Sequence, residues 1–330
     1  MVPEPRRIPG SHTRVSSRRA GDTIALSPVP PFDFDLSAFI FSDGDPDIRS
    51  YHGGAFCQAL RLGGGIFLVT VTSEGTVEQP LVRVEVSPGP AGAGVLKDAG
   101  VMVSNLFNLD LDLTPFTEAV KGDPVMSALA LRFRGLKSPR TATLFEALVD
   151  SIVEQQISLA AAHGIERRVV RTFGDTLAWK GTTYYAFPSP ERLAASSVEA
   201  LRACGLSSKK AEYILGIARG VQDGTLDLEG YELRENTPSI VDELTTIRGV
   251  GTWTAELAVL RGLSRLDAIP ADDLGIRRTI SQFYSRASRI DSGEARRIAE
   301  AWGAWKGLAA YYLVVAELKG IKVGDLGIGY

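Results

Sequence analysis

Two adjacent carboxylates stand in the stretch IPADDLGIRR, residues 269–278. Asp272 and Asp273 follow a proline and come directly before a segment with helical spacing, so an aspartate here can cap that helix. One aspartate suffices for a cap, which leaves the other without a structural role. A free carboxylate can stabilise a developing positive charge or position a water nucleophile.

A glycine-bracketed turn lies upstream, in IRGVGTWTAELAVL, residues 247–260. Gly249 and Gly251 can take positive φ, and they remove side chains that would block the approach of another backbone. The helix that follows points its unpaired first-turn N–H groups and the positive end of its dipole outward, which suits a phosphate. Taken alone, such a turn more often marks a plain helix connection. The aspartates downstream favour the phosphate-binding interpretation.

The composition is that of a folded chain of about two domains. The 330 residues are 45% hydrophobic and 23% charged, and the formal net charge of −3 means that nucleic-acid binding would need a local contact surface. The two cysteines, Cys57 and Cys204, indicate free thiols in a reducing compartment. No apolar run approaches the length of a membrane span, and the first residues lack the apolar centre of a secretory signal. We therefore expect a soluble intracellular protein.

The pattern changes twice along the chain. Residues 1–29 begin rich in Arg, Ser and Pro without periodicity, which predicts a mobile tail. Within residues 30–121, valines at 82, 84 and 86 alternate with polar residues, which predicts an α+β domain with an antiparallel sheet. Within residues 122–330, apolar residues recur at helical spacing between Ser or Asp starts and Gly stops. This last region is predicted to be almost entirely helical.

Together these motifs resemble a known family. LTTIRGVGTWTAELAVLRG followed by PADDLGIRR is similar to the helix-hairpin-helix, Gly/Pro-rich loop and aspartate signature of the HhH-GPD DNA glycosylases. LFEALVDSIVEQQISLAAA and GLSSKKAEYILGIARG also resemble that superfamily. The resemblance is to the AlkA-type 3-methyladenine DNA glycosylase II branch and is strong from about residue 123 to 318. It implies an N-terminal α+β domain followed by an all-α glycosylase core of two helical subdomains.

The resemblance implies base excision repair of DNA. A damaged purine, expected to be alkylated, is flipped out of the duplex, and Asp273 is assigned to the oxocarbenium charge or the attacking water. Asp272 is then expected to be the cap or a support residue. Superfamily members that also cut the backbone carry a lysine at the position of Trp253, so the resemblance implies a monofunctional hydrolase without lyase activity. Simple core packing is the alternative role for Trp253.

The resemblance also assigns DNA and substrate contacts. Gln156 matches the wedge that fills the space of the flipped base, and Gln155 matches a neighbouring minor-groove or pocket contact; an exposed helix end with solvated amides is the alternative. The hairpin residues implied in DNA binding are Gly249, Val250, Gly251, Thr252, Trp253 and Thr254. The substrate pocket is assigned to Trp253 and Leu257. Leu257 and Val314 stand where this branch has pocket aromatics, which leaves the lesion open.

The resemblance implies no required cofactor. No four-cysteine iron–sulfur run follows the aspartates, and the three histidines lack zinc-type spacing. Hairpin carbonyls, those of Thr245, Arg248 and Val250, could hold a structural Na⁺ or K⁺ ion that bridges to phosphate. The expected partner is duplex DNA with a damaged base, in the cytoplasm or nucleoid. A monomer is expected, because the enzyme closes around one site on bent DNA.

Two other functions stay open. A non-catalytic HhH DNA-binding protein would keep the hairpin, although it has no use for a second acid after Pro270. A glycosylase for oxidised or deaminated purines would keep the chemistry and change only the pocket.

Overall fold

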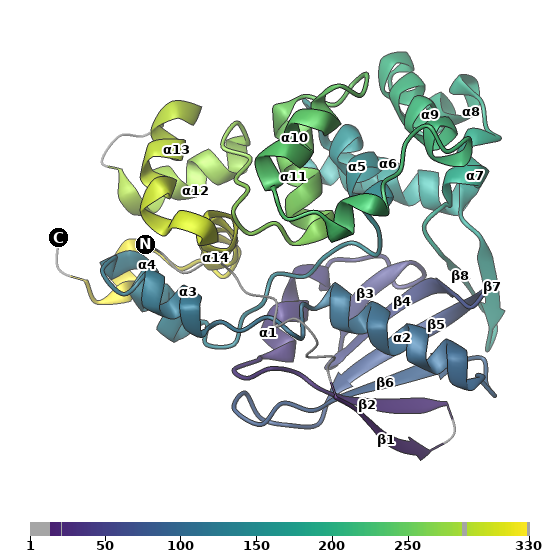
Figure 1. Cartoon of the computed structure of the whole chain (residues 1–330), viewed down its shortest axis with the longest axis horizontal. Coiled ribbons are helices and arrows are strands. Elements are labelled where there is room, and N and C mark those ends of the chain that lie inside the picture. The colour runs from purple at the N-terminus through teal and green to yellow at the C-terminus, as the bar shows by residue number, and fades with distance from the viewer. Residues whose placement is uncertain (1–13, 21, 286–288, 329–330) are drawn as a thin grey trace.

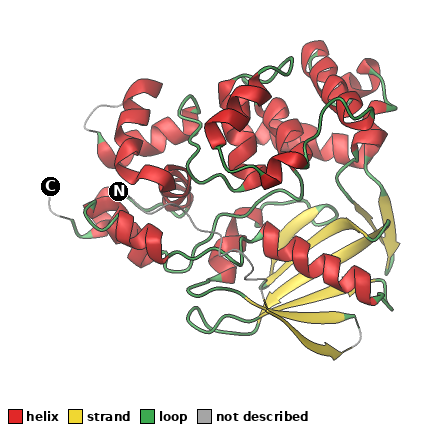
Figure 2. Cartoon of the chain, viewed as in Figure 1, coloured by secondary structure: helices red, strands yellow, loops and turns green. Residues whose placement is uncertain are grey.

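A sheet lies at one end of the molecule and helices make up the rest (Figure 1). The computed structural model describes residues 14–20, 22–285 and 289–328. Colouring by secondary structure separates a strand-rich part from a helical part (Figure 2). The predicted α+β class, with an antiparallel sheet followed by a largely helical region, is confirmed. None of the described helices is long and apolar enough to cross a membrane.

One antiparallel sheet of six strands forms the first part, in the order β1-β2-β6-β5-β4-β3. The strands are β1 (Arg14–Ala20), β2 (Thr23–Ser27), β3 (Arg49–His52), β4 (Ala55–Leu62), β5 (Gly65–Ser73) and β6 (Val82–Ser87). The prediction of a mobile tail over residues 1–29 is wrong for the last part of that range. β2 pairs with β6, and this pairing places Ile24 and Leu26 in the core. Residues 1–13 lie outside the described residues.

One helix covers a face of this sheet. α2 (Ala93–Leu106) packs on β2, β4 and β6. The valines at 82, 84 and 86 are buried with Leu96 and Val103 of α2, whereas Arg83 and Glu85 between them are exposed. The alternation in β6 therefore has the predicted cause, a strand with one buried and one solvated face. A short helix, α1 (Phe34–Ala38), and a 3₁₀ turn, η1 (Phe39–Phe41), extend this core.

The helices enclose two further apolar cores. The first core is built from α5 (Leu144–Glu154), α6 (Leu159–Phe173), α7 (Pro190–Ala194), α8 (Val198–Ala203), α9 (Ser208–Gln222), α10 (Thr237–Thr245) and α11 (Thr252–Leu263), with η2 (Gly230–Leu233) beside them. The second is built from α3 (Thr114–Ala119), α4 (Pro124–Arg132), α12 (Leu274–Tyr284), α13 (Ser292–Ala299), α14 (Lys306–Leu318) and the 3₁₀ turns η3 (Glu300–Trp305) and η4 (Val323–Leu326).

Two segments cross the boundary predicted at residue 121. α3 belongs with the helices, because the Phe116 ring lies 5.8 Å from Trp305 and 5.0 Å from Tyr312. A small hairpin, β7 (Thr176–Trp179) with β8 (Thr182–Tyr185), interrupts the helical region and reaches back to the sheet part. The backbone N–H of Tyr185 donates to the carbonyl of Asp47 at 2.8 Å.

Helices α5 and α11 pack antiparallel at close range. A Cβ placed on Gly262 would lie 2.9 Å from Leu144 Cα and 3.0 Å from Ala147 Cβ, so the contact requires glycine. Leu144 begins α5, and Gly262 lies in the last turn of α11. At the opposite ends, Gln155 donates to Thr254 Oγ1 at 2.9 Å. The end of α5 and the start of α11 therefore meet at one edge of the helical part.

Charged groups join the sheet to the helices. Arg49 of β3 lies 2.7 Å from Glu146 Oε1 on α5 and 3.3 Å from Glu166 Oε1 on α6. Asp150, one turn after Glu146, is only 7% exposed, and its Oδ1 has no hydrogen-bond partner among the described residues. Burial, with repulsion from Glu166 and Glu146, raises the pKa of the Asp150 carboxyl well above its ordinary value.

This raised pKa predicts a stabilising substitution. The folded state holds the Asp150 proton more tightly than the unfolded chain does, so the stability lost to Asp150 grows as pH rises through the folded-state pKa. Asp150→Asn is expected to raise Tm near pH 7 by about 2–4 °C. The gain should shrink as pH falls toward about 4, the pKa of an unfolded aspartate.

Differential scanning calorimetry across that pH range measures the effect. Asp98→Asn, on the exposed face of α2, is the matched control and should leave Tm unchanged. A lower Tm for Asp150→Asn at pH 7 would contradict the interpretation.

Candidate DNA-binding and active site

The predicted hairpin is formed by the end of α10 and the start of α11. Its turn is closed by the N–H of Val250, which donates to the carbonyl of Ile247 at 3.0 Å, and Val250 itself is buried in the first helical core. Gly251 is the N-cap of α11 and, having no side chain, leaves the first-turn amides of Thr252, Trp253 and Thr254 without a side-chain cap. Gly251 and Thr252 are exposed. The arrangement leaves the positive end of the helix open to an anion.

The other glycine of the turn has a different task. Gly249 has φ +93°, in the left-handed region, and a Cβ there would lie 2.2 Å from the Tyr213 ring on α9. The guanidinium of the neighbouring Arg248 sits 5.5 Å over the same ring and pairs with Glu212 at 2.9 Å. Gly249 is therefore required by the packing of the hairpin on α9, whereas Gly251 lies open to an incoming backbone.

The two aspartates divide their roles differently from the prediction. Asp273 is the N-cap of α12: its Oδ1 accepts from the N–H groups of Gly275 at 2.8 Å and Ile276 at 3.0 Å. The expectation that Asp272 caps this helix is wrong. Its side chain is 52% exposed and lies 3.7 Å from Arg296. A carboxylate has two oxygens, so capping occupies only one of those on Asp273.

The second oxygen of Asp273 faces the hairpin helix. Trp253 Nε1 donates to Asp273 Oδ2 at 3.1 Å, across the twenty residues that separate them. Trp253 is half-buried and stands one position into α11, so it is not a core-packing residue. The hairpin and the aspartate loop are thus joined by a direct hydrogen bond. The indole N–H and the α12 amides together hold the carboxylate in a fixed orientation.

The two glutamines lie in the loop between α5 and α6, and their environments differ. Gln156 is exposed and has φ +57°, an uncommon conformation for a residue other than glycine. Gln155 is half-buried, and its side-chain amide donates to the Gly249 carbonyl at 2.9 Å and to Thr254 Oγ1 at 2.9 Å. Gln155 thus holds the hairpin with both amide protons, and only its Oε1 is left for the contact predicted from the sequence.

Sequence reasoning missed the role of α9. Lys210 Nζ donates to the carbonyls of Val153 at 2.9 Å and Gln155 at 2.6 Å, so it closes the end of α5 just before Gln156. Arg261, also missed, lies 2.6 Å from Glu154 on the same turn of α5. The segment SSKKAEY gives no sign of the two Lys210 hydrogen bonds, because a lysine on a helix is usually solvated.

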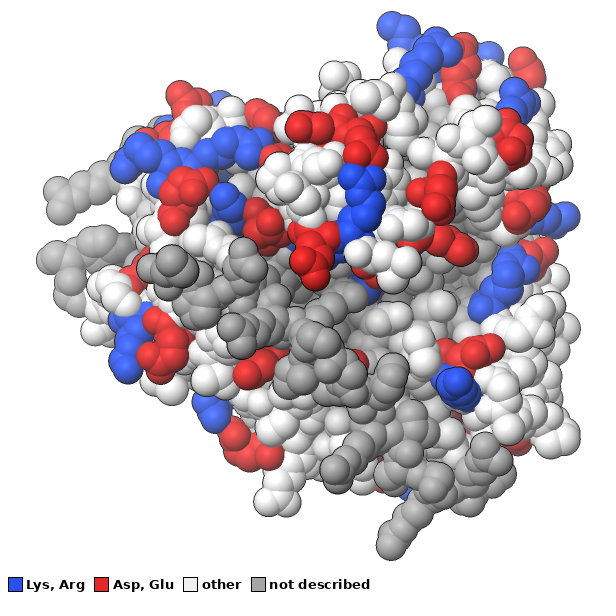
Figure 3. All heavy atoms as spheres, viewed as in Figure 1, with Lys and Arg blue, Asp and Glu red and all other residues white. Residues whose placement is uncertain are grey.

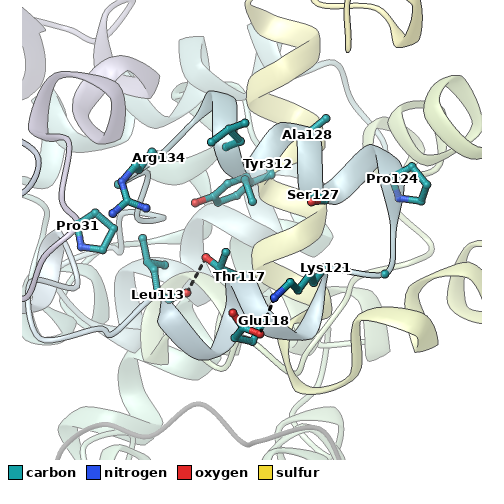
Figure 4. A pocket seen from close by; sticks show the side chains of 14 residues that line it. Pro31, Leu113, Thr117, Glu118, Lys121, Pro124, Ser127, Ala128, Arg134 and Tyr312 are labelled. Carbon is teal, nitrogen blue, oxygen red and sulfur yellow. Dashed lines mark hydrogen bonds and ion pairs between the residues drawn. The ribbon is translucent and has the colours of Figure 1, made fainter. Parts of the chain in front are cut away.

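Two cavities formed by the described residues lie apart from the predicted pocket residues Trp253 and Leu257. Leu257 is 4% exposed. One cavity, of about 480 Å³, lies between α3, α4 and α14 and is lined by Lys121, Arg134 and Tyr312 among others (Figure 4). The other, of about 430 Å³, touches the hairpin helix at Thr252. The aromatic residues of the last helices, Trp302, Trp305 and Tyr312, are core residues.

No metal cluster is evident in the part of the chain that the structure describes: no three His, Cys, Asp or Glu side chains are grouped there as ligands. Acidic and basic side chains are interspersed on the face seen in Figure 3. The main-chain carbonyls of Thr245, Arg248 and Val250 accept no hydrogen bond from the described residues. At the hairpin, the groups free to meet an anion are the first-turn amides of α11.

Comparison with known proteins identifies relatives of this chain. Residues 149–304 match the profile of the HhH-GPD superfamily base excision DNA repair protein. A DNA-3-methyladenine glycosylase of Bacillus subtilis is 37% identical over 207 residues, 63% of this chain and 68% of the relative. DNA-3-methyladenine glycosylase 2 of Escherichia coli is 27% identical over 291 residues, 87% of this chain and 95% of the relative.

A solved structure extends the similarity to the sheet. The 3-methyladenine DNA-glycosylase of Archaeoglobus fulgidus superposes with a TM-score of 0.79 at 26% identity, over 90% of this chain and 99% of that one. The fold and the site therefore define a DNA repair protein of the base-excision class. More closely, the chain belongs to the HhH-GPD superfamily, among its DNA-3-methyladenine glycosylases.

The two hairpin glycines should fail in different ways when substituted. Gly249→Ala is expected to lower the free energy of unfolding by about 1–3 kcal/mol, because alanine is strained at this φ and its Cβ meets Tyr213. Gly251→Ala has open space for its Cβ and φ −90°, so its stability should match that of the parent protein.

Thermal unfolding and fluorescence anisotropy with a duplex separate the two effects. Gly251→Ala is expected to weaken DNA binding by about tenfold without lowering Tm, since its methyl group would keep a phosphate from the amides. Unchanged DNA affinity in Gly251→Ala would argue against the amide grip.

Proposed function

We propose that this protein hydrolyses the N-glycosidic bond of alkylated purines in duplex DNA and leaves the strand uncut. The observation that carries the proposal is the Asp273 carboxylate, which caps α12 with one oxygen and meets the indole N–H of Trp253 with the other. This carboxylate stands at the junction of the phosphate-binding hairpin and the following loop. A nucleotide gripped by the hairpin would therefore bring its sugar to an anionic side chain.

The chemistry needs a fixed negative charge. As the C1′–N bond breaks, its electron pair leaves with the base and the sugar becomes an oxocarbenium ion. Asp273 would stabilise this cation and accept a proton from the water that attacks C1′. Hydrogen bonds from two backbone amides and one indole orient the carboxylate before the reaction, so little reorganisation is needed as charge develops.

Trp253 supports hydrolysis over strand cutting. A lyase reaction needs an amine that attacks C1′ and forms a Schiff base. No lysine is present between residues 246 and 263, which span the hairpin and α11, and the indole at position 253 cannot form an imine. Water is then the nucleophile, and the product is an intact strand with an abasic site.

DNA contact and base flipping would be shared between two loops. The exposed Gly251 and Thr252 would approach a phosphate, while the exposed Gln156 would occupy the space of the flipped base. The carbonyls of Thr245, Arg248 and Val250 would hold a monovalent cation between the hairpin and the phosphate. One chain carries every group named here, which supports a monomer as the working unit.

The adjacent aspartates provide a matched test of the catalytic role. Asp273→Asn should bind lesion-containing DNA normally and lose base release by about 10²-fold or more. Asparagine caps helices as well as aspartate does, so the fold is expected to survive. Asp272→Asn removes the same charge one residue away, from a carboxylate 52% exposed, and should keep base release.

Single-turnover release of 3-methyladenine and 7-methylguanine, with hypoxanthine and 8-oxoguanine duplexes alongside, measures the activity. Near-normal release by Asp273→Asn would remove it from the catalytic role. Release of 8-oxoguanine in preference to both alkylated purines would overturn the substrate assignment.

Borohydride reduction tests the nucleophile. An enzyme that uses water forms no imine with the sugar, so borohydride should trap no covalent protein–DNA adduct. The abasic product should also stay uncleaved until alkali is added. A trapped adduct seen on a denaturing gel would show that an amine attacks C1′, contrary to the proposal.

A further inference from the structure

The first turns of α9 contact both loops assigned to DNA. On one side, Glu212 pairs with Arg248 and the Tyr213 ring fills the space beside Gly249, so the hairpin rests on α9. On the other side, Lys210 reaches the loop that carries Gln156. Residues that are distant in sequence are thus placed by the first turns of one helix.

Lys210 closes the end of α5. Its ammonium donates to the carbonyls of Val153 and Gln155. These carbonyls lie at the end of α5, where no following helical turn supplies an N–H donor. A positive charge is also favourable at the C-terminal end of a helix. The Gln155 carbonyl belongs to the peptide bond that leads directly into Gln156. Lys210 therefore fixes the orientation of the peptide from which Gln156 departs.

The same short segment is held from the opposite side. The Gln155 side chain donates to the Gly249 carbonyl and to Thr254 Oγ1, so main chain and side chain of Gln155 are tied to different elements. Directly after these attachments the chain turns to φ +57° at Gln156. Such a conformation persists where surrounding contacts determine it. Beyond this turn the Gln156 side chain is exposed.

We propose that Lys210 is a positioning residue that holds the Gln155–Gln156 peptide so that Gln156 enters the DNA duplex as the base leaves it. The inference rests on the proposed function and names a residue on which base flipping depends. Lys210 acts through the loop between α5 and α6, which carries Gln156, and does not need to touch DNA. A lysine that served only to neutralise phosphate would present its ammonium to solvent, whereas this one is half-buried against two carbonyls.

The neighbouring Lys209 supplies the matched control. It is exposed, adjacent in sequence and equal in charge. Lys210→Met keeps the aliphatic stem and removes the donors, and Lys209→Met removes one positive charge from the same surface. Both variants should lose DNA affinity to a similar small extent, within about threefold of each other, because each alters one charge. Lys210→Arg keeps a cationic donor and should restore most of the lost function.

Flipping can be measured without catalysis. A duplex with 2-aminopurine beside an uncleavable abasic-site analogue fluoresces more strongly when the neighbouring stack is opened. Lys210→Met is expected to give a smaller increase than Lys209→Met at saturating protein. Single-turnover base release from 7-methylguanine DNA should fall about tenfold or more in Lys210→Met only, since misplacement by about 1 Å is costly.

A double-mutant cycle ties the effect to the wedge. If Lys210 acts through Gln156, adding Lys210→Met to Gln156→Ala should cause little further loss of fluorescence change or base release. Equal behaviour of Lys210→Met and Lys209→Met would overturn the proposal, as would additive losses in the double variant. Thermal unfolding of each variant identifies a general loss of fold. A lower Tm in Lys210→Met that Lys210→Arg does not restore also counts against the proposal. If the parent protein releases no base, the proposed function fails while the fluorescence comparison still tests Lys210.

Discussion

The close antiparallel contact between α5 and α11 governs the arrangement of the site. Gly262 lets α11 approach Leu144 and Ala147 so closely that no space is left for a Cβ at position 262. This contact fixes which helix ends lie together. The loop that carries Gln156 leaves α5 at the same edge where the hairpin enters α11. Gln155 then bridges the two loops. A bulkier residue at position 262 would separate the helices and, with them, the groups assigned to the phosphate and to the base.

Asp273 shows how one side chain can hold a helix end and also be oriented for the proposed chemistry. Its cap on α12 gives the carboxylate a fixed position, and the hydrogen bond from Trp253 gives it a fixed rotation. The same two contacts connect the first helical core, which contains α11, to the second, which contains α12. A change in the relative position of these cores would therefore move the carboxylate against the hairpin. The proposed chemistry depends on that alignment.

Several features could be predicted because they are local. The alternation in β6, the helix spacing after residue 122 and the glycine turn each depend on neighbours a few residues away. The tail was predicted too long because β2 is short and becomes a strand only by pairing with β6, sixty residues later. The small hairpin of β7 and β8 was missed for the same reason, since it docks against the sheet part.

By itself, the sequence determined the α+β class, the hairpin and the presence of paired aspartates beside it, because each is encoded in residue type and short-range spacing. Only the tertiary structure decided that Asp273 and not Asp272 caps α12, since both are adjacent acids and the choice depends on where the loop places them. It also decided that Gln155 faces the hairpin and that Lys210 closes α5. Those contacts join residues 55 to 99 positions apart, and packing alone brings them together.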